Sequence, residues 1–190
     1  MGFTKEFEVQ AHGNTKLQVI NTNELHKAAT IIEQYERHLE LERHKIVGVD
    51  VEYTNDVGQD QKPALVQLSV GMDHPVLLFQ LSAADKNCTR FDIPRRPQKE
   101  WRVPTTTKPL DSLGDASGIL VHDVELTNAE KQRWARMPLS MRHTGYAAKD
   151  AYAAYEIWSR LTIIQEGLRR AKLDKKQTRK RARSYGDYDY

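Results

Sequence analysis

The chain has 190 residues, of which 39% are hydrophobic and 29% charged, so it can form one ordinary domain with a sizeable core. No apolar run reaches the length of about 18 residues that a transmembrane helix needs, and the N-terminal MGFTKEFEVQ has no apolar core of the signal-peptide kind. The single cysteine, Cys88, cannot form an internal disulfide. We therefore expect an intracellular protein, in the nucleus and/or the cytoplasm, with no membrane partner.

The positive charge is concentrated near the C-terminus. The 29 Lys and Arg and 26 Asp and Glu give a net charge of +3, but residues 169–183 hold nine basic residues and one Asp, a net of +8, which leaves −5 for the rest. Such a run is typical of a phosphate-contacting segment or a nuclear-localisation signal, and a solvated helix end is an equally good interpretation. We predict a domain over residues 1–170 and a basic, polar tail over 171–190, whose candidate nucleic-acid contacts are Lys175, Lys176, Arg179, Lys180, Arg181 and Arg183.

The N-terminal segment predicts two strands and a helix. Residues 5–10 and 16–21 alternate apolar with polar side chains, which is typical of strands, and a glycine-containing turn joins them. Apolar residues then recur at helical spacing from Glu24 to about Arg43, and Thr22 or Asn23 is the expected cap.

The middle of the chain predicts three more strands and then a loop. Residues 45–54, 63–71 and 75–81 are strand candidates, and the turn residues between them favour a meander of antiparallel hairpins. From about 84 to 108 the sequence has three prolines and no sustained period, so we interpret it as loop. A structureless loop of that length is uncommon inside a compact domain.

The C-terminal part returns to helical spacing. Short helices are predicted at 109–121 and at 127–136, the second capped by Thr127 or Asn128 and ending near Pro138. The last helix is the longest, from about 141 to 176. Its inward-facing stripe is predicted to consist of Tyr146, Asp150, Ala154, Ile157, Leu161, Ile164 and Leu168.

Two carboxylates stand close together on one predicted strand. In IVGVDVEYT the side chains of Gly48, Asp50 and Glu52 share one face, because side chains alternate along a strand. The apolar flanks favour a central strand, where two carboxylates lose hydration and repel each other. A divalent cation would remove both penalties, so we predict a metal site. The alternative is an edge strand whose acidic face lies in water.

A third acid lies on the last helix. Tyr146 and Asp150 are four residues apart, about one helical turn, so their side chains are neighbours on the inward stripe. An unpaired carboxylate is not tolerated in the interior, which favours a functional role for Asp150. The alternative is an acid that merely stabilises the start of the helix through its dipole.

The strand motif Asp50-x-Glu52 followed by the helical motif Tyr146-x-x-x-Asp150-Ala-Tyr resembles motifs one and three of the DEDD superfamily of 3′–5′ exonucleases. Tyrosine four residues before the last Asp resembles the tyrosine subgroup, with its RNase D-like and Werner-type members, the plant ones in particular. The resemblance covers roughly residues 5–168. It implies an α/β fold, a ribonuclease H-like mixed sheet flanked by helices.

The resemblance also implies a chemistry, two-metal phosphodiester hydrolysis at a single-stranded 3′ end of DNA or RNA. Asp50, Glu52 and Asp150 would hold Mg²⁺ or Mn²⁺ ions about 4 Å apart, and Tyr146 would orient the attacking water. Carboxylate oxygens are hard ligands that match these two cations.

The sequence departs from the family at motif two. The family has a fourth acid at the start of a helix after a small-residue strand, and about 30 residues that should carry this strand–helix unit are missing between about Asp92 and Gln98, by comparison with the family. None of the nearby acids stands in that context: Asp85, Asp92, Asp111, Asp115 and Asp123.

Three functions follow from this departure. The chain is expected to be a catalytically impaired, nucleic-acid-binding relative of the exonucleases. Alternatively, it is a protein-interaction module that pairs with itself or with another protein over the surface left by the missing unit. A working exonuclease with a substitute acid is the third interpretation, in which a loop acid such as Asp92 would replace one on a rigid element.

Overall fold

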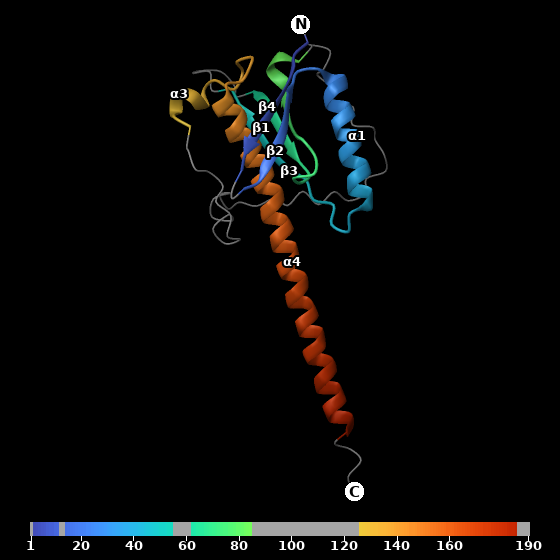
Figure 1. Ribbon diagram of the computed structural model, residues 1–190. Coiled ribbons are helices and arrows are strands. Elements are labelled where there is room, and N and C mark those ends of the chain that lie inside the picture. The colour runs from blue at the N-terminus through green and yellow to red at the C-terminus, as the bar shows by residue number, and fades with distance from the viewer. Residues whose placement is uncertain (1, 12–13, 55–61, 85–125, 186–190) are drawn as a thin grey trace.

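The computed structural model describes residues 2–11, 14–54, 62–84 and 126–185 (Figure 1). The helix predicted at 109–121 and nearly all of the predicted loop at 84–108 lie outside the described residues. The position at which the sequence predicts a missing strand–helix unit lies outside them too.

Five strands form one mixed sheet in the order β1-β2-β5-β4-β3. Strands β2 and β5 are parallel, and the other three neighbouring pairs are antiparallel. The prediction of an α/β fold with a mixed, largely antiparallel sheet is therefore confirmed. The strands are β1 (Thr4–Gln10), β2 (Lys16–Thr22), β3 (Gly48–Tyr53), β4 (Pro63–Ser69) and β5 (Val76–Gln80).

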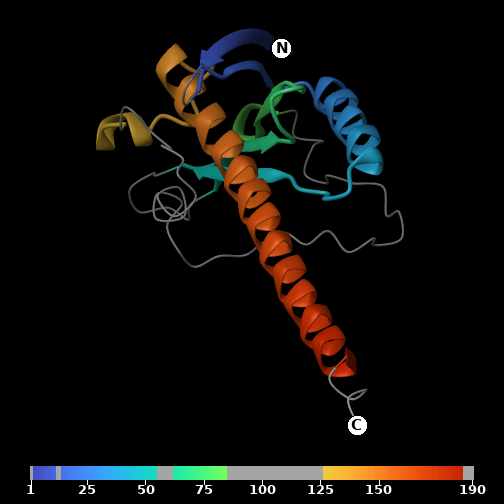
Figure 2. The ribbon, with the colours of Figure 1, turned by 60° about the horizontal axis from the view of Figure 1, so that its bottom comes forward.

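Helices cover both faces of the sheet (Figures 1 and 2). Helix α1 (Leu25–Leu41) buries Ala28, Ile31, Tyr35 and Leu39 against Leu77 and Phe79 of β5 and their neighbours. Helix α4 (Met141–Tyr185) packs on the opposite face, where the alternate residues Val76 and Leu78 point. Strand β5 is thus buried on both faces, which its apolar run Val76–Phe79 requires.

The predicted cap of α1 is wrong. The N-cap position is Glu24, and no side chain caps the helix. Asn23 instead accepts a hydrogen bond from the Phe3 backbone N–H (2.7 Å) and donates one to the Ala83 carbonyl oxygen, in the short 3₁₀ turn η1 (Leu81–Ala83). The Asn23 side chain thus links the residue before β1 to the turn after β5. Because its polar atoms make these tertiary contacts, they do not cap the helix.

The helices before the C-terminus have different lengths from those predicted. Helix α3 (Asn128–Lys131) is short, because backbone hydrogen bonds such as Arg133 N–H to Glu130 O (2.8 Å) close three-residue turns after it. Thr127 caps it in a capping box with Glu130, as one of the two predicted caps. Helix α4 is longer than predicted and continues to Tyr185, since the basic run consists mostly of strong helix formers.

The inward stripe of α4 is confirmed only in its first half. Ile157 is fully buried, whereas Ile164 and Leu168 are 51% and 59% exposed. Figures 1 and 2 show why: the helix crosses the sheet diagonally and then projects beyond it. We call residues 141–160 the proximal segment of α4 and residues 161–185 its distal segment. No helix among the described residues combines the length and apolar character needed to cross a membrane.

Strand β3 lies at the edge of the described sheet, although the apolar flanks predicted a central strand. Within the described ranges it pairs with β4 alone, and Val49 is 41% exposed. The flanks are apolar for another reason: Val47 packs against the core under α1, and Gly48 lies directly against α4. The proximal segment of α4, rather than a second neighbouring strand, shields the carboxylates of β3.

Candidate metal centre

Glycine brings β3 and α4 into direct contact. A β-carbon on Gly48 would lie 2.0 Å from the Ala151 carbonyl oxygen and 2.6 Å from the Tyr155 backbone nitrogen. Such distances are far inside van der Waals contact, so only glycine permits this approach. Asp150 precedes Ala151 on the helix, and Asp50 follows Gly48 by two residues on the same face of the strand. The close approach therefore brings the carboxylates of two elements together.

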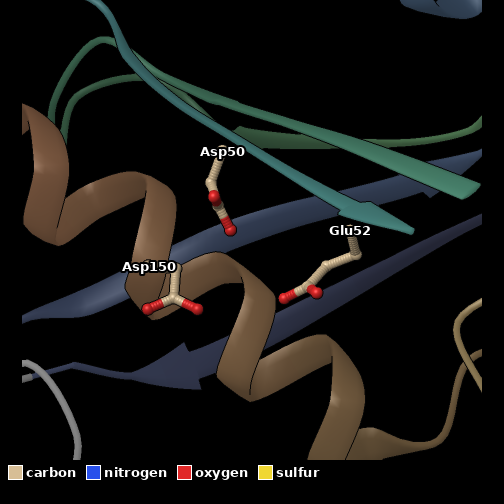
Figure 3. Close-up of side chains that lie close together, drawn as sticks. All are labelled: Asp50, Glu52 and Asp150. Atoms are coloured by element: carbon tan, nitrogen blue, oxygen red, sulfur yellow. The ribbon is translucent and has the colours of Figure 1, made fainter. Parts of the chain in front are cut away.

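The three predicted acids converge. One carboxylate oxygen each from Asp50, Glu52 and Asp150 can be chosen so that all lie within 4.8 Å of one another. Figure 3 shows the side chains of Asp50 and Glu52, from β3, and of Asp150, from α4, with their carboxylates close together. Asp150 is buried and the other two are half-buried. Within the described part of the chain, this is the one group of three or more acidic, His or Cys side chains with such geometry.

The pKa of Glu52 is strongly perturbed. It is raised from an ordinary value of 4.5 to about 7. Burial is the largest cause, and the negative charges of Asp50 and Asp150 contribute the rest of the rise. Gln67 and Lys131 act in the opposite direction and lower the pKa of Glu52. Three carboxylates held this close repel one another, so near neutral pH the cluster takes up a proton unless a cation enters.

The donor set fits a hard divalent cation. All three ligands are carboxylate oxygens, which Mg²⁺, Mn²⁺ and Ca²⁺ prefer. Oxygens on opposite sides of Mg²⁺ are about 4.2 Å apart, since each bond is about 2.1 Å long. The observed spread of 4.8 Å needs only a small contraction to reach that value. The three carboxylates, which carry −3 when all are ionised, supply the attraction.

Tyr146 lies one turn before Asp150, as the spacing predicted. Its ring is half-buried against the core on the α4 face of the sheet, with its centroid 6.2 Å from that of Trp134. Tyr146 is thus on the same side of α4 as the buried alanines that face the sheet, in a position next to the carboxylates along the helix.

His143, the histidine nearest to the motif, has a packing role. Its Nδ1 lies 2.7 Å from Ser140 Oγ and its Nε2 lies 3.0 Å from the Glu130 carbonyl oxygen, while its ring stands edge-on to Trp134. These contacts dock the start of α4 on the turn that contains α3. Both ring nitrogens have partners here, which is a structural use of histidine.

Two residues near the carboxylates were not singled out from the sequence. Gln67 lies on β4 directly opposite Asp50 and is fully buried, and Lys131 of α3 interacts electrostatically with Glu52. The signal for Gln67 was a polar residue between the apolar Val66 and Leu68 in the strand PALVQLS. Lys131 gave no signal, because α3 is far from β3 in sequence.

The remaining candidates are only partly described. Lys175 and Lys176 are exposed on the distal segment of α4, and the side chains of Arg179, Lys180, Arg181 and Arg183 lie outside the described set. The helix runs through this region without a break. The five nearby acids named above, between residues 85 and 123, among them the possible substitute Asp92, also lie outside the described residues.

No protein-family model matches this chain, and no curated protein matches it.

Proposed function

We propose that this chain is a divalent-cation-binding and nucleic-acid-binding domain of the DEDD exonuclease type, tyrosine subgroup, whose hydrolytic activity is weak or lost. The observation that carries the proposal is the convergence of Asp50, Glu52 and Asp150 within 4.8 Å from a D-x-E strand and a Y-x-x-x-D helix. A mixed sheet with helices on both faces is compatible with a ribonuclease H-like fold. Mg²⁺ and Mn²⁺ are the proposed ions.

The chain's own residues have the following parts in this proposal. Asp50, Glu52 and Asp150 hold the cation, and burial against α4 excludes water from one side of the carboxylate cluster. Tyr146 orients a water molecule with its hydroxyl group. When bound, the metal would supply the activation of that water and the stabilisation of the leaving 3′ oxygen.

Charge is the reason for weak activity. Two divalent cations bring +4 into the pocket, whereas the three carboxylates supply −3 and leave a second ion loosely held. Losing one well-placed electrostatic stabiliser costs on the order of 10²- to 10³-fold in rate. Mn²⁺ binds such oxygen sites more tightly than Mg²⁺ in most cases, so any residual cleavage is expected with Mn²⁺.

Nucleic acid is the proposed ligand, DNA or RNA with a single-stranded 3′ end. The basic run of residues 169–183 supports this part, because its net charge of +8 is carried on helix α4, where residues 171–178 are all exposed. A nuclear or cytoplasmic location belongs to the same proposal.

Two measurements on the purified chain test the proposal. Mn²⁺ binding is followed by electron paramagnetic resonance, and we expect binding that Asp150→Asn abolishes. Degradation of a 3′-labelled single strand, and of a duplex with a recessed 3′ end, is followed with Mg²⁺ and with Mn²⁺, and we expect little or none. A chain that binds no Mn²⁺ contradicts the metal centre. Rapid cleavage that Asp50→Asn removes contradicts the loss of activity and supports the substitute acid.

A second function is favoured by the distal segment of α4, which exposes Ile164 and Leu168 on one stripe. We propose that a second copy of this chain covers the stripe in antiparallel orientation. Parallel pairing would bring two segments of net charge +8 together. Antiparallel pairing instead places each segment along the rest of the other copy, whose net charge is −5.

A further inference from the structure

Three buried amide side chains share the α4 face of the sheet. Asn21 on β2, Gln67 on β4 and Gln80 on β5 are each 0% exposed. Neither the side-chain nitrogen nor the oxygen of any of them has a hydrogen-bond partner among the described residues. A buried amide without partners destabilises a fold, so a core position that keeps one has a use for its polar atoms.

Gln67 differs from the other two in its distance from the carboxylates. It lies on the strand next to β3 and pairs with Asp50, so both side chains point to the same face. Gln80 pairs instead with Leu65, which itself pairs with Glu52, so Gln80 stands two strands from the acids, about 9.5 Å across the sheet. Asn21 lies still further, on β2.

Gln67 also interacts with Glu52. Its amide lowers the pKa of that carboxyl, in opposition to burial and to the two neighbouring charges. Because Gln67 pairs with Asp50 and Glu52 lies two residues further along β3 on the same face, Gln67 and Glu52 are diagonal neighbours within reach of long side chains. Neither polar atom of Gln67 has a hydrogen-bond partner within the described residues. A carboxylate accepts about four hydrogen bonds or metal bonds, so Glu52 can take a donor and a cation together.

We propose that Gln67 is a positioning residue of the metal centre: its side-chain N–H donates to the Glu52 carboxylate and fixes the orientation in which Glu52 binds a divalent cation. This inference rests on the proposed function, since it needs Glu52 to be a ligand. Partners behind a metal ligand hold it in the binding geometry, and losing one costs about 10- to 100-fold in affinity.

The test is a pair of matched substitutions, Gln67→Leu and Gln80→Leu, in the full chain. Both remove a fully buried, unpartnered amide from the same face of the same sheet. We expect both to keep or raise the melting temperature in EDTA, because an apolar side chain of similar size suits a buried site better. Gln67→Leu should weaken Mn²⁺ binding about 10-fold or more and broaden the Mn²⁺ resonance spectrum, while Gln80→Leu should leave both unchanged.

A Gln67→Leu variant that keeps or gains stability but loses Mn²⁺ affinity indicates a positioning role, because replacing a purely structural residue would lower both quantities. Equal Mn²⁺ affinity in Gln67→Leu and the parent chain overturns the inference but leaves the metal centre intact. Equal weakening in both variants also overturns it. If Gln67→Leu does not fold, Gln67→Met keeps the length of the side chain and removes the donor, with the same expectations. A parent chain that binds no Mn²⁺ overturns the proposed function and this inference together.

Discussion

The two segments of α4 belong to one continuous helix but have opposite surroundings. The proximal segment packs through small residues. Four of its alanines are buried: Ala147, Ala148, Ala151 and Ala153. The distal segment has larger apolar residues, Ile164 and Leu168, yet these are more than half exposed. Size and hydropathy therefore do not decide burial here. The sheet ends, and beyond it no described element lies against the helix.

The contrast extends to polar contacts. The proximal segment contributes Asp150 to the carboxylate cluster, where burial strengthens the repulsion between the charges. The distal segment is linked to the loop after α1 by Glu166, which lies 3.0 Å from Arg43 and 3.3 Å from His44. Surface ion pairs of this kind contribute about 0–1 kcal/mol. We expect the proximal segment to carry the fold and the distal segment to carry contacts with other molecules.

Glycine substitution gives the largest expected difference between the segments. Gly48→Ala places a β-carbon inside the α4 backbone, so β3 and the proximal segment must separate, and we expect a loss of about 3 kcal/mol in the free energy of unfolding. Gly167→Ala is the matched change in the distal segment, where a β-carbon meets nothing within 4 Å. There we expect a gain of up to about 1 kcal/mol, because alanine favours helix.

Urea unfolding followed by circular dichroism measures both variants. Gly48→Ala should also weaken Mn²⁺ binding, since the same contact sets the distance between Asp50 and Asp150. A loss of stability in Gly167→Ala, or none in Gly48→Ala, would remove the physical basis of the comparison.

The pH dependence of stability tests the carboxylate cluster, to which the proximal segment contributes Asp150. Because the pKa of Glu52 is raised from 4.5 to about 7 in the folded state, the folded chain binds a proton more tightly than the unfolded chain. The contribution of Glu52 is fully present below about pH 4.5 and is lost as the pH rises through about 7. In EDTA we therefore expect the melting temperature to fall by on the order of a few degrees between pH 5 and pH 8.

Glu52→Gln removes the titration of this residue and should flatten the fall in melting temperature. Any pH dependence that remains in the variant comes from other groups, such as His74, whose pKa is lowered by burial. Added Mn²⁺ should raise the melting temperature most at pH 8, because it binds the ionised carboxylates. A parent chain whose stability rises with pH as much as that of Glu52→Gln would contradict the perturbed pKa.

Much of this molecule is predictable from its sequence, and what is not has a physical reason. The strand positions could be predicted, because apolar and polar residues alternate along each strand. The carboxylate cluster could be predicted, because Asp50, Glu52 and Asp150 are acidic residues in otherwise apolar surroundings. The edge position of β3 could not, because apolar flanks report burial on a face and not the number of neighbouring strands. The exposure of Ile164 could not either, since a helical stripe predicts a buried face only where a partner exists.

Self-association sharpens the comparison at the distal segment. Ile164→Glu with Leu168→Glu changes the exposed stripe, and we expect it to convert a dimer of the parent chain to a monomer while the melting temperature stays within a few degrees. Ile163→Glu is the control, because Ile163 is equally apolar and 66% exposed but lies about 100° away around the helix. Light scattering after size-exclusion chromatography gives the mass. A monomeric parent chain, or a dimer that only Ile163→Glu disrupts, contradicts pairing through the stripe.

The smallest expected effect concerns the exposed lysines of the distal segment. Lys175→Gln with Lys176→Gln removes two positive charges, and each phosphate contact to a single strand contributes about 0.7 to the slope of log affinity against log salt concentration. We expect the slope to fall by up to about 1.4 for a fluorescently labelled oligonucleotide titrated at several NaCl concentrations. The control is Lys27→Gln with Lys45→Gln, which removes the same charge from exposed positions on α1 and before β3. If both pairs lower the slope equally, the effect is that of net charge alone. If neither does, the basic run is a solvated helix end or a localisation signal, and any strand that the chain binds must approach the carboxylate cluster without it.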